Sequence, residues 1–373
     1  MSISNARTRI AALLALLIVA VFVAACGGDD DGGDEQASGG STSTETSGGT
    51  TEQPLLLSST FGLYFLPIQV AVDQGYFEDE GLDVQVQETN GSSFVTQQMI
   101  AGNADFGVAG APSVIIAYEK DPTLRALSCI ESQSIFSIYV PADSDVQTVE
   151  DLDGQSIGIT ERGGGEEPMV ISVIAENDLD TQIVPVGQET ASLVRALDDG
   201  QVAAFSSSIG TRTSIEAELE LREITPDKYR ATPGDCLISS ESVLEENPGA
   251  AEGLMRAIAK GAYFALENPE AALEIGCRIA PEQCDGQRGY AQSLVDKMMV
   301  LMEPTVEGGT VSQIEAPGWE LTRDLLAETG TLDGQVDISG LIASPEVTEI
   351  EETVFGDFSA DQSAAEEDAA GAQ

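Results

Sequence analysis

Short apolar segments typical of strands alternate with segments typical of helices between residues 54 and 224 of this 373-residue chain. PLLLSS at 54–59 predicts a strand, and a helix is expected from Pro67 to Gly75, because Pro suits the first turn of a helix and Gly its end. One strand–helix pass runs from PLLLSS to LRALSCI, and a second runs from SIGIT to LREI. Two such passes predict an α/β fold with two parallel-type sheets flanked by helices.

The order of these segments also predicts two lobes. The chain is expected to pass from the first lobe to the second between Ser132 and Val140, and to return between Tyr229 and Ser239. Helices are then predicted over residues 249–267, 269–278, 287–302 and 317–329, packing back on the first lobe. The predicted domains are lobe I, residues 54–135 with 236–355, and lobe II, residues 136–235. Two lobes joined by two crossings form a hinged cleft that can close around a ligand.

The N-terminus has the pattern of an export signal. Arg7 and Arg9 precede an uninterrupted apolar run, Ile10–Ala25, which is shorter than the roughly 20 residues of a spanning helix. Residues 1–25 are therefore predicted to be a lipoprotein signal peptide, and a transmembrane anchor is the alternative. The VAAC segment that ends in Cys26 resembles a bacterial lipobox, which predicts a mature chain that starts at a lipid-modified Cys26.

Two segments have few or none of the large apolar residues that a core requires. Residues 26–53 consist almost entirely of Gly, Ser, Thr and acidic residues, and they predict a disordered tether between the acylated Cys26 and the folded part. Residues 356–373 are small and acidic, and they predict a disordered tail.

The charge and the missing histidines exclude several functions. The chain has 16 Lys and Arg against 64 Asp and Glu, a net charge of -48, which disfavours binding to nucleic acid. It contains no His, so catalysis by a His base and a His-ligated metal site are both excluded. Catalysis by paired carboxylates stays formally possible, but so many acids produce pairs by chance. We expect no enzyme activity, no cofactor and no metal.

Four cysteines remain once Cys26 is acylated. An even number in an exported protein indicates disulfides. Cys277 and Cys284 are close in sequence, and Cys129 and Cys236 lie in short apolar segments that could be neighbouring strands. These positions favour the pairs Cys277–Cys284 and Cys129–Cys236. Four free thiols are the alternative, and a four-thiolate zinc site is disfavoured by the spacing.

Five segments, in their order along the chain, resemble one protein family. They are GYFEDEGLDVQV (75–86), MIAGNADFGVAG (99–110), VEDLDGQSIGIT (149–160), LVRALDDGQVAAF (193–205) and NPGAAEGLMRAIAKGAYFALENPEAAL (247–273). Together they resemble the periplasmic solute-binding proteins of ABC importers, in the branch that binds sulfonates, taurine, nitrate-like anions, riboflavin and the pyrimidine precursor of thiamine. The resemblance spans about residues 55–330. Ala203 departs from it, because the family often has Asp there.

The resemblance implies a type II periplasmic-binding-protein fold and a transport function. A lipid-anchored, monomeric protein at the outer face of the cytoplasmic membrane would capture a small organic solute and deliver it to an ABC permease and its ATPase. One alternative is a surface receptor that presents a ligand to a sensor. A pyrimidine-synthase-like enzyme is the other, but the active-site His and the cysteine-rich iron motif of such enzymes are missing here.

The ligand is expected beyond the carboxyl ends of the strands, as in other open α/β sheets. The loops there carry hydroxyls, backbone N–H groups at helix starts, and the rings of Phe61 and Tyr64, which could stack on a planar ligand. The predicted ligand-binding residues are Ser59, Thr60, Phe61, Tyr64, Gly110, Ser113, Thr160, Arg162, Gly163, Gly164, Ser206 and Ser207. As alternatives, Ser59 and Thr60 are typical of turn caps, and Gly163–Gly165 are typical of a flexible connector.

Arg162 bears on the charge of the ligand. It is the one basic side chain in these loops and would be the natural partner of an anion. Glu161, Glu166 and Glu167 surround it in the sequence and disfavour a small dianion. We therefore expect a neutral or zwitterionic organic solute, with a sulfonate as the rival.

Overall fold

The computed structural model describes residues 50–160, 162, 165–187, 189–356 and 358–372. The predicted signal peptide, the lipid-modified Cys26, nearly all of the tether, and Gly163 and Gly164 lie outside these residues. Among the helices that the structure describes, none combines the length and apolar character that a membrane span needs.

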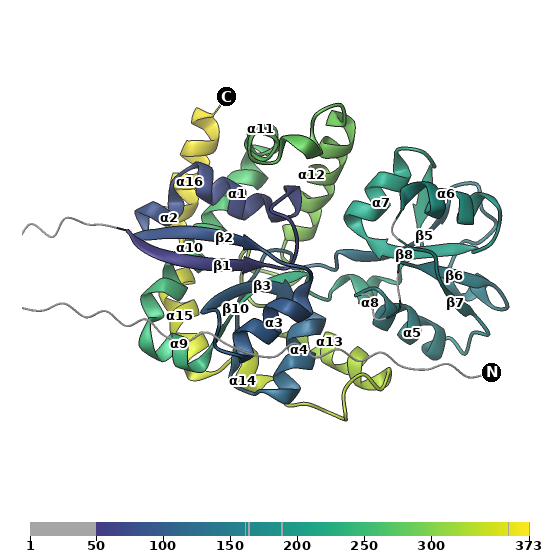
Figure 1. Ribbon diagram of the computed structural model, residues 1–373, viewed down its shortest axis with the longest axis horizontal. Helices are drawn as coiled ribbons and strands as arrows, with labels where there is room; N and C mark the ends of the chain where they lie inside the picture. The colour runs from purple at the N-terminus through teal and green to yellow at the C-terminus, as the bar shows by residue number, and fades with distance from the viewer. Residues whose placement is uncertain (1–49, 161, 163–164, 188, 357, 373) are drawn as a thin grey trace, which may run out of the picture. The chain divides into compact units, whose positions relative to one another are not determined.

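The first five-stranded sheet, sheet A, has the strand order β2-β1-β3-β10-β4 (Figure 1). Its strands are β1 (Thr51–Leu57), β2 (Leu82–Glu88), β3 (Phe106–Gly110), β4 (Leu124–Cys129) and β10 (Asp235–Ser240). β1 pairs in parallel with β2 and β3, whereas β10 is antiparallel to β3 and β4. β1 begins inside the predicted tether, because Thr51 pairs with Leu82 in register with the rest of the strand.

The second sheet, sheet B, has the order β7-β6-β8-β5-β9. Its strands are β5 (Phe136–Pro141), β6 (Ser156–Ile159), β7 (Gln182–Pro185), β8 (Ala204–Ser208) and β9 (Leu221–Glu223). β6 is parallel to β7 and β8, and β5 is antiparallel to β8 and β9. The predicted class, an α/β fold with two helix-flanked sheets, is thus confirmed, but both sheets are mixed.

The mixed strand directions follow from the chain path. The chain crosses from sheet A to sheet B before β5 and back to sheet A before β10. Each of these strands therefore begins at the side of its sheet where the parallel strands have their carboxyl ends. A strand that starts at this carboxyl edge has to run against its neighbours, as the pairing of β5 and β10 shows.

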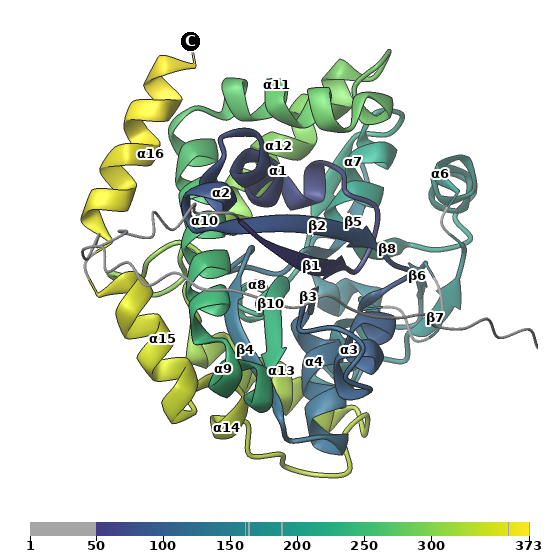
Figure 2. The ribbon, with the colours of Figure 1, turned by 60° about the vertical axis from the view of Figure 1, so that its left-hand side comes forward.

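Sheet A is covered by helices on both faces (Figure 1, Figure 2). Leu55 and Leu57 pack with one helical layer and Leu56 with the other, as expected for alternating side chains. The first layer contains α1 (Leu66–Asp73), α2 (Tyr76–Asp79), α10 (Pro248–Glu267), α11 (Pro269–Ile279) and α12 (Arg288–Met302). The second contains α3 (Ser92–Ile100), α4 (Ala111–Lys120), α13 (Ala316–Glu328) and α14 (Ser339–Ile342).

Sheet B has its own helices. α5 (Glu167–Glu176) and α8 (Asp227–Arg230) pack on one face, and α6 (Thr190–Asp198) and α7 (Ile209–Glu216) pack on the other. The short remaining elements are α9 (Glu241–Glu246) and the 3-10 helices η1 (Leu63–Phe65), η2 (Val149–Leu152) and η3 (Pro281–Gln283).

The C-terminal residues differ from the prediction of a disordered tail. α15 (Pro345–Phe355) is followed by α16 (Ser359–Gly371), which packs on α10. Ala365 and Ala369 are buried in this contact, and Tyr76 donates a hydrogen bond to Asp368 Oδ2 at 2.9 Å. The tail has few large apolar residues, but alanines one helical turn apart allow two helices to approach closely, which composition alone does not reveal.

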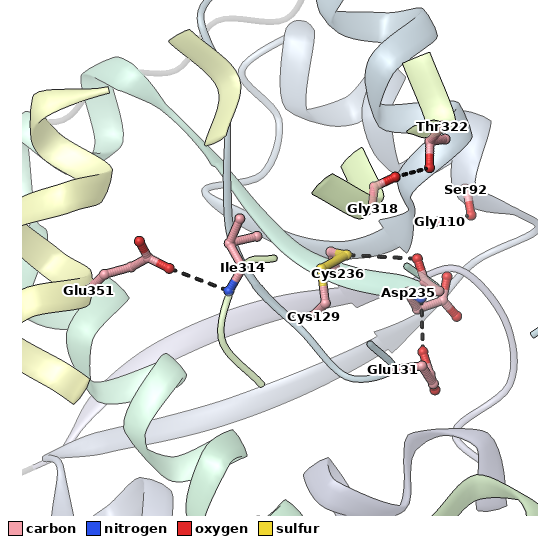
Figure 3. Close-up of a disulfide and its surroundings, with 11 residues drawn as sticks. Ser92, Gly110, Cys129, Glu131, Asp235, Cys236, Ile314, Gly318, Thr322 and Glu351 are labelled. Carbon is pink, nitrogen blue, oxygen red and sulfur yellow. Dashed lines mark hydrogen bonds between the residues drawn. A yellow bond between two sulfur atoms is a disulfide. The ribbon is translucent and has the colours of Figure 1, made fainter. Parts of the chain in front are cut away.

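The four cysteines that the structure describes lie in two close pairs. Cys129 and Cys236 face each other on the antiparallel strands β4 and β10, and Cys277 and Cys284 close the turn between α11 and α12. The first pair lies two residues from Glu131 and one from Asp235, at the point where the chain leaves and re-enters sheet A (Figure 3).

Candidate functional site

A cavity of about 270 Å³ lies at the carboxyl edge of sheet A. Its wall consists mainly of hydroxyl groups, together with the carboxylate of Asp235, and sheet B contributes Ser208. The lining residues are Ser58, Ser59, Tyr64, Gly91, Ser92, Ile135, Ser208 and Asp235. Ser59 and Tyr64 were predicted as ligand-binding residues. Thr60 and Phe61 lie in the same loop but do not line this cavity.

The loop after β1 is held in place by side chains from distant parts of the chain. Phe61 N–H donates to Glu88 Oε1 at 2.8 Å, and Leu63 N–H donates to Gln283 Oε1 at 2.8 Å. A Cβ at Gly62 would overlap the end of the Gln283 side chain, so a larger residue here would displace Gln283 from this contact. Gln283 comes from the Cys277–Cys284 turn, so this turn supports the loop that carries Ser59 and Tyr64.

Tyr64 reaches from this loop to sheet B. Its hydroxyl donates to Ser208 Oγ at 3.2 Å and accepts a hydrogen bond from Gly210 N–H at the start of α7. Burial raises the pKa of Tyr64 above its ordinary value, so the hydroxyl stays protonated. The prediction gave Tyr64 a stacking role, whereas the structure uses its hydroxyl to connect the two sheets.

Asp235 and Glu131 form a carboxyl pair beside the cavity (Figure 3). Asp235 N–H donates to Glu131 Oε2 at 2.9 Å, and Glu131 is only 1% exposed. Burial raises the pKa of Asp235 to about 6, against a smaller opposing effect of a hydrogen bond with Ser58. Burial, and then the neighbouring Asp235 charge, raises the pKa of Glu131 well above its usual range.

Sequence reasoning missed both acids. The predicted ligand-binding loops all follow the carboxyl ends of strands. Asp235 instead begins β10, an antiparallel strand whose amino end lies at the cavity. Knowing that β10 follows a crossing from the other sheet would have placed its amino end at this edge. The predicted return crossing between Tyr229 and Ser239 is therefore the sequence signal that places Asp235 at the cavity.

A second, smaller cavity of about 50 Å³ lies where α4 and α5 begin. Gly110 and Pro112 line it from the end of β3, and Gly165 and Pro168 line it from the start of α5. The predicted residue Gly110 donates its N–H to Ser92 Oγ at 2.9 Å, which joins this cavity to the wall of the first. Ser113, one residue after Pro112, does not line either cavity.

Two of the residues predicted from sheet B, Thr160 and Ser207, form hydrogen bonds with other residues of sheet B or its loops. Thr160 donates its N–H to Glu166 Oε1 at 2.8 Å and its hydroxyl to the same oxygen, and Glu166 is 2% exposed. Ser206 and Ser207 are fully buried, and Ser207 Oγ lies 2.6 Å from the Tyr139 hydroxyl. β8 extends to Ser208, so Ser208 occupies the edge position that the prediction gave to Ser206 and Ser207.

Arg162 does not line these cavities. Its guanidinium forms an ion pair with Glu167 at 2.6 Å and donates to the Ile183 carbonyl at 2.7 Å, while its side chain is 56% exposed. The prediction that Arg162 anchors an anionic ligand therefore has no support in this arrangement.

A third cavity, of about 210 Å³, lies beside the crossing segment that leads into β5. Its wall carries Arg212, Arg230 and Lys297, but acids neutralise them: Arg212 pairs with Glu223 at 2.6 Å, and Lys297 pairs with Glu216 at 2.8 Å. The Lys297–Glu216 pair connects α12 with α7. This cavity is therefore bordered by an ion-pair network rather than by free cations.

The fold is shared with solved solute-binding proteins. The periplasmic aliphatic sulphonate binding protein SsuA from Escherichia coli superposes with a TM-score of 0.63 at 15% identity, covering 79% of this chain and 92% of that one. At this identity the likeness shows the fold alone.

Three proteins related in sequence match this chain over most of their own lengths. The riboflavin-binding protein RibY of Chloroflexus aurantiacus is 20% identical over 76% of this chain and 82% of that protein. The formylaminopyrimidine-binding protein of Halalkalibacterium halodurans is 24% identical over 68% and 78%. A third relative, from Legionella pneumophila, is named 4-amino-5-hydroxymethyl-2-methylpyrimidine phosphate synthase and is 23% identical over 61% and 73%.

The family itself is shown by a match over more than half of the chain. Residues 63–272, from the loop that carries Tyr64 to the middle of α11, match the family described as NMT1/THI5 like. This confirms the resemblance drawn from the five sequence segments: the chain belongs to the NMT1/THI5-like family.

Proposed function

We propose that this protein is the solute-binding component of an ABC importer, which captures a small organic solute at the carboxyl edge of sheet A and hands it to a membrane permease and its ATPase. One observation carries the proposal. The 270 Å³ cavity is built from Ser58, Ser59 and Asp235 of one sheet and Ser208 of the other, in a fold shared with solute-binding proteins. A ligand that touches both sheets favours their closed arrangement over an open one.

The proposed ligand is a nitrogen heterocycle or a related organic solute. The cavity offers hydroxyl groups and one carboxylate, and its wall of described residues contains no Lys or Arg. Two relatives are named for riboflavin and formylaminopyrimidine, which are both nitrogen heterocycles. A sulfonate, the ligand class in the name of SsuA, has no cationic partner on this wall.

The proposal includes export and anchoring. The lipobox-like segment before Cys26 supports cleavage there and attachment by acyl chains to the outer face of the cytoplasmic membrane. In that oxidising setting we expect both cysteine pairs to be disulfides. Mass spectrometry of the membrane-associated protein without reductant would detect an acylated Cys26 and no alkylatable thiol. An unmodified N-terminus or four alkylatable thiols would contradict these two parts of the proposal.

The relative that is named as a synthase makes an enzyme the second candidate. This chain has no His, so Asp235 and Glu131 would have to supply any acid–base chemistry at the cavity. We expect binding without turnover. Incubation with an aminopyrimidine, followed by mass spectrometry, would contradict this if product formed in excess over the protein.

A thermal-shift screen tests the proposal as a whole. Riboflavin, formylaminopyrimidine, ethanesulfonate and nitrate are added separately, and we expect a heterocycle to raise Tm, because a ligand that binds only the folded state stabilises it. The shift should disappear in Ser59→Trp, which fills the cavity from an exposed loop position. It should persist in the control Ser363→Trp, on the exposed side of α16. No Tm shift with these compounds or a wider solute library would overturn the proposal.

A further inference from the structure

The acids at the base of the 270 Å³ cavity lack the cations that usually accompany buried acids. Glu131 is 1% exposed, and neither Glu131 nor Asp235 forms an ion pair with Lys or Arg anywhere in the part of the chain that the structure describes. The Glu131 carboxylate accepts from its own backbone N–H and, at 2.9 Å, from the Asp235 N–H, and the Asp235 carboxylate forms a hydrogen bond with Ser58. A buried carboxylate without a counter-charge is costly, so it either takes up a proton or gains a positively charged partner.

The Asp235 carboxylate is positioned at the cavity rather than in the core. Asp235 lines the cavity, and its Oδ1 lies next to the backbone of Gly110, where a Cβ would be 3.5 Å away. Glu131 supports it from behind through the Asp235 N–H. Gly234 permits this approach, because a Cβ at Gly234 would lie 2.6 Å from Glu131 Oε2. Asp235 is thus able to touch a ligand, and Glu131 is a positioning residue.

Two further charged groups that hold loops at these strand ends are also acids. Glu88 accepts from Phe61 N–H in the loop that borders the cavity, and the buried Glu166 accepts from Thr160 at the end of β6. The basic side chains of the neighbouring 210 Å³ cavity, Arg212, Arg230 and Lys297, are paired with Glu223 or Glu216. An anionic ligand would therefore meet a carboxylate and no positive side chain on the described wall of the cavity.

We infer that Asp235, positioned by Glu131, makes this cavity selective for a ligand that presents a positively charged nitrogen group, an amidinium or ammonium, and excludes carboxylates and sulfonates. This inference rests on the proposed function, since it assigns a ligand class to the same cavity. An amidinium offers two parallel N–H donors, which match a carboxylate in geometry and charge. The raised pKa values of Asp235 and Glu131 agree with it, because burial without a counter-charge among the described residues disfavours the ionised form of both acids.

Three compounds with one ring and different head groups test the inference on the full-length wild-type protein: benzamidine, benzamide and benzoate. Isothermal titration calorimetry near neutral pH is expected to detect benzamidine, with benzamide at least tenfold weaker and benzoate without measurable binding. No variant is needed, so a folding defect cannot obscure the result. Benzoate binding as tightly as benzamidine would overturn the inference, and so would an absence of benzamidine binding at millimolar concentration.

Two variants assign the effect to Asp235. Asp235→Asn is expected to lower benzamidine affinity by about tenfold or more, as for loss of a charged hydrogen bond. It should also reduce the preference for benzamidine over benzamide, a change that a merely structural role would not produce. Glu351→Gln is the matched control: this half-buried acid also has a raised pKa, but it accepts from Ile314 N–H away from the cavity (Figure 3). Equal affinities in both variants and the wild type would overturn the role of Asp235.

The outcomes also separate this inference from the proposed function. If ethanesulfonate or benzoate raises Tm and the shift disappears in Ser59→Trp, the protein binds solutes in this cavity and only the charge selectivity is wrong. If no compound of either series binds, the proposed function fails together with the inference.

Discussion

The Tyr64 hydroxyl lies 3.2 Å from Ser208 Oγ, so a side chain from the loop after β1 of one sheet contacts the last residue of β8 in the other. The same hydroxyl accepts the Gly210 N–H at the start of α7. Gly210 has to be glycine here, because a Cβ would overlap the Tyr64 ring. The two sheets are thus connected through one phenol at the edge of the cavity.

Tyr64→Phe is expected to lower the free energy of unfolding by roughly 1–2 kcal/mol. The variant lacks the hydroxyl that accepts from the partly buried Gly210 N–H and donates to Ser208 Oγ. Urea denaturation measures this. Ser208→Ala, which keeps the contact with Gly210, should cost less. Equal losses in the two variants would show that the Gly210 bond contributes nothing.

A second prediction concerns the contact between α1 and α10. A Cβ on Gly261 would overlap the carbonyl oxygen of Pro67, which belongs to the backbone and cannot rotate away. Gly261→Ala should therefore destabilise the protein by roughly 3 kcal/mol or more, as strained core substitutions do. Gly249→Ala, in the same helix with open space around its Cβ, should be neutral or stabilising by up to about 1 kcal/mol. Similar thermal unfolding of the two variants would contradict the close packing.

Glu351 predicts a pH dependence of stability. Burial raises the pKa of Glu351 to about 7 in the folded protein, against an ordinary value near 4.5. At pH values between these two pKa values, the folded state holds more protons than the unfolded state. The free energy of unfolding therefore falls as pH rises through this range. The loss between pH 5 and 8 should be on the order of 2 kcal/mol smaller in Glu351→Gln than in the wild type. Urea denaturation at both pH values measures the difference, and parallel pH profiles would contradict the raised pKa.

Arg162→Ala distinguishes the sequence-based prediction from the observed pairing. A charged hydrogen bond to an acidic ligand would cost roughly 1.5–3 kcal/mol of affinity when lost. Because Arg162 is paired with Glu167 and Ile183 and lies outside the described cavities, we expect affinity for the heterocycle found in the screen to change by less than about twofold. A tenfold loss measured by calorimetry would restore Arg162 to the site.

Local patterns predicted most of the regular elements. The predicted strand at 54–59 overlaps β1, the helix expected from Pro67 to Gly75 overlaps α1, and the four predicted C-terminal helices agree with α10, α11, α12 and α13 to within about one residue. The tail was predicted wrongly, since α16 depends on small residues that fit against α10 and not on an apolar face of its own.

The candidate site was predicted less well. Ser59, Tyr64 and Gly110 line the observed cavities, because they follow strands whose ends the sequence locates. Thr160, Arg162, Ser206 and Ser207 also follow such strands, but their side chains are taken up by partners or by the interior of sheet B.

The sequence by itself determined the α/β class, the family, the order of the elements and the loops in which a site could form, since these depend on periodicity and on signals within a few residues. Only the tertiary structure decided the antiparallel directions of β5 and β10, the contact of Tyr64 with Ser208, and the pairing of Asp235 with Glu131, 104 residues apart. Each of these depends on where a crossing chain enters its sheet and on which polar groups burial leaves without a partner, and both are properties of the packed molecule rather than of any local segment.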